Sequence, residues 1–293
     1  MLELKKILVP IDFSERSVAA AEHAGALARR FGSELILVHV VPVSPYEYAA
    51  FESGLYTGSK WPTEEELGEK LGRELATIAA KFAPHSAVEQ IILKGDAPAK
   101  IERVAKEKKV DLIVMPTHGY GTFRRFVLGS VTTKVLHDLE CPILTGAHVE
   151  EITFDGGAPY QHIACAVDLR EHSEAVLKWA SGFGQAFGAE LTVLHAAPIL
   201  DAEPETQSFA HKLTQMLVHT KEEEVRELLT RVGSNGSVLV DCDSVTNLVP
   251  RACQEIGADL LVIGRSPLRG LLGRLRTHAH ALVRESPCPV ISV

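Results

Sequence analysis

The sequence has few features of a membrane, secreted or nucleic-acid-binding protein. Its 293 residues contain no apolar run near the roughly 18 residues that a membrane-spanning helix requires. Aromatic residues make up only 6%, and the net charge of −8 gives no electrostatic support for nonspecific binding of nucleic acid. We therefore expect neither a membrane nor a nucleic acid as a partner.

Cysteine is also scarce. The five cysteines include no C-x-x-C pair, and the N-terminus lacks the layout of a signal peptide. A scattered, odd set of thiols is typical of a reducing compartment, so we expect a cytoplasmic protein without a structural zinc site. His278 and His280 have H-x-H spacing but no third candidate ligand nearby, and we predict no metal site.

The common phosphate-binding fingerprints are missing too. The sequence has no G-x-x-x-x-G-K-[ST] loop, and the glycines at Gly119 and Gly121 lead to Arg124, where a dinucleotide-binding loop needs a third glycine. These departures disfavour both a P-loop NTPase and a Rossmann dehydrogenase.

What the sequence does contain is an internal repeat. The segment Lys6–Asp12 resembles His162–Asp168, and a histidine follows each aspartate 27 residues later, at His39 and His195. Residues 110–114 and 141–144 likewise resemble residues 258–262 and 288–291. We predict two domains of ordinary size, at residues 1–148 and 160–293, joined by a linker at 149–159.

Within each copy, short apolar runs alternate with helical patterns. The first copy has runs typical of buried parallel strands at 7–11, 35–40, 88–93, 111–115 and 142–144. Residues 16–31, 100–109 and 131–139 have helical periodicity, and Ser14 and Gly32 are suited to cap the first of these helices. We predict two tandem doubly wound (Rossmann-like) α/β domains, each a five-stranded, mainly parallel sheet with helices on both faces. The segment 45–69, rich in aromatic residues, is expected to be a surface loop.

Ligands of such sheets bind beyond the carboxyl ends of the strands, where the strand order reverses. Asp12, His39 and Pro116 lie at these ends, and we expect His39 to be a buried, hydrogen-bonded histidine. Gly129 and Ser130 immediately precede a predicted helix. Their backbone N–H groups and the Ser130 hydroxyl are therefore candidates for binding phosphate.

On these residues the chain resembles a tandem universal stress protein over essentially its whole length. ATP-binding members of that family carry G-x-x-G, nine residues and then G-[ST]. Gly119, the next nine residues and Gly129-Ser130 match, whereas Pro116 replaces the leading glycine. The resemblance implies that the first domain binds ATP, with AMP or ADP as alternatives and Mg²⁺ as a companion of ATP. The contacts that it implies are Pro10, Ile11, Asp12, Val40, Met115, Pro116, Gly119, Gly129, Ser130 and Val131.

The resemblance also assigns roles within this site. Asp12 would contact the ribose or adenine end, the Val40 backbone would read the adenine edge, and the glycines with Ser130 would hold the phosphates. Pro116 lacks an N–H group, but its carbonyl can still accept a hydrogen bond from a ribose hydroxyl. Simpler roles remain open: Asp12 as a turn cap, Gly129 as a turn residue and Ser130 as a helix N-cap.

The second copy differs at the phosphate end. Gly264 stands where the leading glycine belongs, but Pro267 and Thr277-His278 replace the second glycine and the G-[ST] pair. Bulky side chains there would crowd a phosphate, so we expect no ATP binding of the family type in the second domain.

Three functions remain to be distinguished. The first is a stress-response regulator or sensor that binds an adenine nucleotide. The second is an enzyme, and because we find no general base or acidic pair for Mg²⁺, we expect at most slow ATP hydrolysis. The third is a scaffold without a nucleotide, which Pro116 favours. The resemblance further implies that the final strands, at 143–145 and 290–292, pair as an intramolecular pseudo-dimer, with a homodimer of two chains left open.

Overall fold

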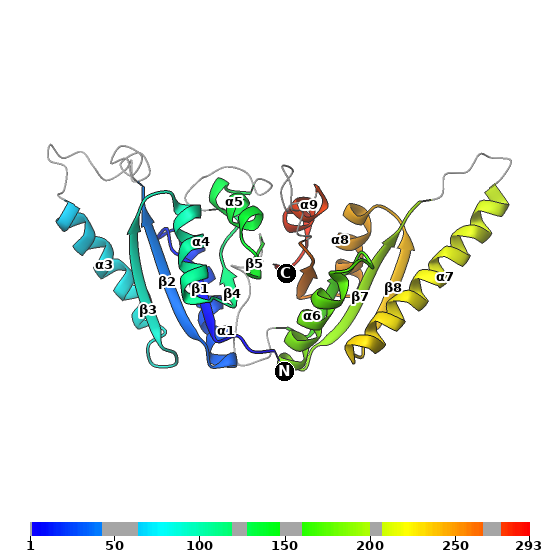
Figure 1. The fold of residues 1–293 in the computed structure, drawn as a ribbon, viewed down its shortest axis with the longest axis horizontal. Helices are drawn as coiled ribbons and strands as arrows, with labels where there is room; N and C mark the ends of the chain where they lie inside the picture. Colours follow the sequence, from blue (N-terminus) through cyan, green and yellow to red (C-terminus); the bar gives the residue numbers. More distant parts are fainter. Residues whose placement is uncertain (1, 43–63, 119–127, 147–159, 200–206, 266–276) are drawn as a thin grey trace. The chain divides into compact units, whose positions relative to one another are not determined.

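The computed structural model describes residues 2–42, 64–118, 128–146, 160–199, 207–265 and 277–293 (Figure 1). These residues form two compact units, which consist mainly of Glu3–Thr145 and of Thr153–Val293. The predicted linker at 149–159 lies outside the described residues.

Both units alternate strand and helix, as the repeat predicts. The first contains β1 (Lys6–Pro10), α1 (Glu15–Phe31), β2 (Glu34–Val41), α3 (Glu64–Ala80), β3 (Val88–Lys94), α4 (Ala97–Lys108), β4 (Leu112–Val114), α5 (Ser130–Asp138) and β5 (Ile143–Thr145). The second contains β6 (His162–Ala166), α6 (Ser173–Phe187), β7 (Glu190–Ala197), α7 (Gln207–Val232), β8 (Ser237–Cys242), α8 (Val245–Glu255), β9 (Leu260–Ile263), α9 (Thr277–Glu285) and β10 (Val290–Ser292).

The strands of each unit pair in parallel. Their orders are β3-β2-β1-β4-β5 and β8-β7-β6-β9-β10. Because the chain moves one way from β1 to β3 and the other way from β3 to β5, right-handed crossovers place α1 and α3 on one face and α4 and α5 on the other. The predicted doubly wound class is confirmed. The strand order reverses between β1 and β4, and between β6 and β9, which is where such sheets bind ligands.

Local signals in the sequence placed the first helix correctly. The Ser14 hydroxyl accepts a hydrogen bond from the Ser17 N–H group, and Gly32 ends α1 in the left-handed conformation with φ of 69°. A glycine suits this position because it has no Cβ to clash there. Both predicted caps are confirmed.

The predicted loop at 45–69 is partly wrong. Helix α3 begins at Glu64, so the last residues of that segment are helical, and residues 43–63 lie outside the described part of the chain. The helix is held by its apolar face, on which Leu71 and Leu75 are fully buried at a spacing of four residues.

Among the described residues, no helix combines the length and the hydropathy that crossing a bilayer requires.

Candidate functional site

A cavity of about 340 Å³ opens at the carboxyl ends of β1, β2 and β4 in the first unit. Gly119 lies outside the described residues. The other nine predicted contacts all line this cavity: Pro10, Ile11, Asp12, Val40, Met115, Pro116, Gly129, Ser130 and Val131. The crossover topology therefore brings together residues that the sequence places on four separate segments.

Asp12 shapes the turn that follows β1. Its Oδ1 atom accepts hydrogen bonds from the Ser14 backbone N–H (3.0 Å) and from the Ser14 hydroxyl. Phe13 between them has φ of 65°, a left-handed conformation that costs a non-glycine residue about 1–3 kcal/mol. The turn-capping role is thus real, yet it occupies one oxygen only. Within the described chain no donor contacts Oδ2, which is left for another partner.

His39 links β2 to the end of β1. Its Nδ1 atom lies 2.7 Å from the Ile11 carbonyl, and because a carbonyl can only accept, Nδ1 carries the proton. The Nε2 lone pair is buried without a hydrogen-bond partner among the described residues. Burial of the ring lowers the pKa of His39, against smaller opposing effects of the Ile11 bond and the Asp12 charge. The predicted buried, hydrogen-bonded histidine is confirmed.

Gly129 is the N-cap of α5, and its own N–H group is engaged. It donates to the Thr117 carbonyl (2.8 Å), so this candidate phosphate donor is already bonded within the chain. A Cβ atom at Gly129 would lie 3.2 Å from the same carbonyl oxygen, and the glycine therefore permits a close backbone approach. Its φ of −60° does not itself require glycine.

The free donors lie one residue further on. Ser130 is the first helical residue rather than the N-cap, and α5 has no side-chain cap, unlike α1 and α4, where Ser14 and Asp96 supply one. The first backbone N–H groups of a helix have no acceptor within it, and those of Ser130, Val131 and Thr132 have none elsewhere in the described chain. This helix end thus lines the cavity with uncapped donors.

Several lining residues were missed at the sequence level, and Thr132 and His118 are two polar examples. The buried Thr132 hydroxyl donates to the Pro116 carbonyl (3.0 Å), so this carbonyl keeps only one of its two lone pairs for a ligand. His118 also lines the cavity, with Nδ1 2.9 Å from the Thr117 hydroxyl oxygen, and its partial burial lowers its pKa. The position of Thr132 in the first turn of α5 was the available sign, since a side chain there can reach back to the preceding loop.

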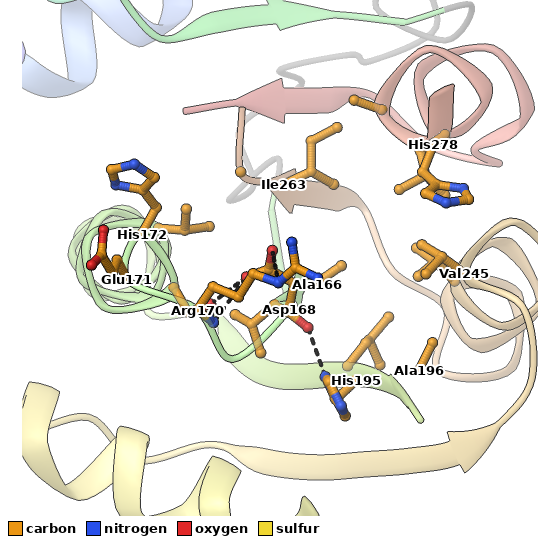
Figure 2. Close-up of a pocket in the computed structure, with 18 residues that line it drawn as sticks. Ala166, Asp168, Arg170, Glu171, His172, His195, Ala196, Val245, Ile263 and His278 are labelled. Carbon is orange, nitrogen blue, oxygen red and sulfur yellow. Dashed lines mark hydrogen bonds and ion pairs between the residues drawn. The ribbon is translucent and has the colours of Figure 1, made fainter. Parts of the chain in front are cut away.

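A second cavity, of about 830 Å³, lies at the matching place in the second unit, at the ends of β6, β7 and β9 (Figure 2). Asp168 Oδ1 accepts from the Arg170 N–H and from the Ser173 hydroxyl, both at 3.0 Å. His195 Nδ1 lies 2.9 Å from the Val167 carbonyl, and Leu169 has φ of 59°. The turn and the histidine bond therefore repeat those of the first unit.

The rims of the two cavities differ in charge pairing. Arg170 Nε lies 3.8 Å from Asp168 Oδ2, whereas Ser14 occupies the equivalent position beside Asp12. Figure 2 shows Arg170 beside Asp168, with His172 and Glu171 to one side and His278 and Val245 to the other. No group of three His, Cys, Asp or Glu residues in the described ranges is arranged to hold a metal ion.

In each unit a doubly wound sheet carries a ligand-sized cavity at its switch point, which defines a two-domain α/β protein of the doubly wound (Rossmann-like) class. The model of the universal stress protein family matches residues 3–145 and again residues 159–293. The chain therefore belongs to the universal stress protein family, a family of stress-response proteins, and carries two of its domains in tandem.

Relatives correspond to one half of the chain. Two universal stress proteins of Methanocaldococcus jannaschii are 36% and 31% identical over 142 and 150 residues. Each alignment covers 48% of this chain, and they cover 80% and 93% of the relatives. A crystal structure of a universal stress protein from Archaeoglobus fulgidus aligns over 99% of this chain and 98% of its own, with a TM-score of 0.67 and 19% identity. This likeness confirms the fold of the whole chain.

Proposed function

We propose that the first domain binds an adenine nucleotide, ATP foremost, and acts as a regulatory or sensor module in the cytoplasm. The observation that carries this proposal is the uncapped start of α5, which lines the same cavity as the free oxygen of Asp12. The cavity volume of about 340 Å³ falls within the roughly 300–1,000 Å³ typical of small-molecule sites.

The start of α5 supports the phosphate part of the proposal. Three adjacent N–H groups, at Ser130, Val131 and Thr132, point out of the first helical turn, where the helix dipole also favours an anion. The Ser130 hydroxyl is exposed and can add a further hydrogen bond. Mg²⁺ would arrive with ATP, held by the phosphates, and AMP or ADP would use fewer of the same donors.

The second requirement, a place for the nucleoside, is met by the ends of β1, β2 and β4. Asp12 Oδ2 can accept from a ribose hydroxyl, and the Val40 backbone lies at the end of β2 for the adenine edge. Apolar side chains of Ile101 and Met115 line the same cavity and provide a surface for a ring. Pro116 offers no N–H group, which restricts its part to packing and to the remaining lone pair of its carbonyl.

Isothermal titration calorimetry with ATP and Mg²⁺ tests this assignment on the full chain. Ser130→Pro removes one N–H group at the first helical position, where proline is tolerated and the preceding Gly129 already has extended angles. We expect at least tenfold weaker binding. Ser130→Ala keeps the N–H group and should lose less, which separates the backbone donor from the hydroxyl.

A matched control is available in α1. Glu15→Pro also places proline first in a helix after an extended N-cap, Ser14, and Glu15 is not among the described lining residues. Its ATP affinity should equal that of the unaltered chain. Absence of binding by the unaltered chain would establish the nucleotide-free scaffold instead, equal affinity in Ser130→Pro would move the phosphates elsewhere, and rapid release of ADP would show an ATPase.

We also propose, from the family resemblance, that the final strands β5 and β10 pair within the chain as a pseudo-dimer. Hydrogen exchange of the backbone N–H groups at 143–145 and 290–292 tests this pairing, because an unpaired strand edge would exchange rapidly. Sedimentation would report whether two chains assemble further.

A further inference from the structure

The second-domain cavity is larger, and several of its lining residues are smaller than their counterparts in the first domain. Its volume of about 830 Å³ compares with about 340 Å³ in the first domain. Aligning the two repeats pairs lining positions that carry a bulkier residue in the first domain. These pairs are Pro10 and Ala166, Val40 and Ala196, Pro116 and Gly264, and Val131 and Ala279.

The added space is not spread evenly. A Cβ atom at Gly264 would lie 3.0 Å from Cγ2 of Val176, which stands where the first domain has Ala20. The room left by this glycine is thus partly filled by the larger residue of α6. Smaller side chains also line the cavity at Ala196 on β7 and Ala279 on α9, the counterparts of Val40 and Val131.

The polar groups of this cavity are arranged differently as well. Asp168 accepts two hydrogen bonds on Oδ1, and its Oδ2 lies 3.8 Å from Arg170 Nε, so this oxygen is ion-paired whereas Oδ2 of Asp12 has no cation beside it among the described residues. His278 replaces Ser130 at the start of the last helix, and its exposed ring adds bulk there. Between these groups the walls are apolar, with Leu194, Val249 and Leu282 among them.

We propose that the second domain is a separate small-molecule site, for an uncharged ring-bearing ligand broader than a nucleoside. The wide apolar interior would hold the rings, and the Asp168–Arg170 pair at the rim in Figure 2 would supply both an acceptor and a donor to one polar edge of the ligand. This site is independent of nucleotide binding by the first domain.

The test uses N-phenyl-1-naphthylamine, a neutral aromatic probe that becomes fluorescent in apolar surroundings. Titrated into the full chain, it should bind at one site, and saturating ATP with Mg²⁺ should not displace it. The double variant Ala196→Val/Ala279→Val restores the residues of the first domain and refills the cavity. We expect it to weaken probe binding at least tenfold, with the single variant Ala196→Val intermediate.

Controls separate this site from the first domain. Ser130→Pro should leave probe binding unchanged, and thermal unfolding of each variant shows whether it is folded. If the double variant does not fold, the single variant decides the matter by the same criterion. Unchanged probe affinity in the folded refilled variant, or displacement of the probe by ATP, would overturn the proposal.

Discussion

The two domains share a frame and differ in what that frame presents to a ligand. In both, an aspartate closes the turn after the first strand, and the residue after it is left-handed. A buried histidine from the second strand bonds to the carbonyl of the residue just before that aspartate. The frame is therefore independent of the phosphate motif, which only the first domain retains. What diverges is the neighbour of the aspartate, Ser14 or Arg170, and the size of the residues around the cavity.

The cores of the two domains also differ, in their content of aromatic residues. Around α6 of the second domain, Tyr160, Trp179, Phe183 and Phe187 form one aromatic cluster, with the rings of Trp179 and Phe183 stacked at 5.1 Å. The first domain has Leu4, His23, Leu27 and Phe31 at the equivalent positions. Aromatic pairs add about 0.5–1.5 kcal/mol beyond burial, so the second core concentrates more of its stability in one place.

The largest effect is expected from a substitution that breaks this aromatic cluster. Phe183 is fully buried and contacts three rings, and Phe183→Ala should lower the free energy of unfolding of the second domain by about 3–5 kcal/mol. Leu27→Ala, the matched change in the first domain, should cost about 2–5 kcal/mol there. Hydrogen exchange under denaturant, followed by mass spectrometry, reports each domain separately. Equal weakening of both domains by either change would show that they unfold as one unit.

Features encoded locally were predictable from the sequence. The strands follow from short apolar runs, and the caps of α1 follow from Ser14 and Gly32. Helix α3 was not predicted, because its start follows an aromatic segment that lacks helical periodicity, while its stability comes from burying Leu71 and Leu75.

The sequence predicted part of the cavity lining, but not its hydrogen bonds. Spacing and resemblance placed nine described residues around one cavity. That Gly129 donates to Thr117, and that Thr132 reaches the Pro116 carbonyl, depends on how Pro116 and Thr117 lie against the start of α5. Such contacts are set by tertiary packing, and the position of Thr132 in the first turn of α5 is the one local sign of them.

The next effect concerns the free oxygen of Asp12. Asp12→Asn keeps an acceptor for the Ser14 N–H group but replaces the second oxygen with a donor, so ATP affinity should fall about tenfold, or about 1.4 kcal/mol. Asp168→Asn is the matched change and should leave ATP affinity unaltered. Calorimetry on both variants checks this, and an equal loss in the two would contradict the division between the domains.

A smaller effect is expected at the Thr132–Pro116 bond, which has no equivalent among the described residues of the second domain, where His280 replaces the threonine. Thr132→Val keeps the shape of the side chain and removes the hydroxyl, so the free energy of unfolding of the first domain should fall by about 0.5–1.5 kcal/mol. Thr133→Val is a control on a less buried neighbour and should change stability less. Chemical denaturation with both variants measures the difference, and equal losses would mean that the hydroxyl bond contributes nothing.

The smallest expected effect is a dependence on pH that arises from His39. Burial lowers the pKa of this histidine below its ordinary value of 6.5, so as the pH falls below 6.5 the unfolded chain takes up a proton that the folded chain still refuses. The free energy of unfolding of the first domain should therefore decrease on acidification until the pH reaches the folded pKa. His118 contributes with the same sign, because its pKa is also lowered by burial.

The contribution of His39 is isolated by comparing the unaltered chain with His39→Gln, whose side-chain amide can still donate to the Ile11 carbonyl. The free energy of unfolding of the variant should depend less steeply on pH between 7 and 5. If it changes with pH as steeply as in the unaltered chain, Asp12 and Glu74, the carboxylates that favour the charged ring, offset the burial.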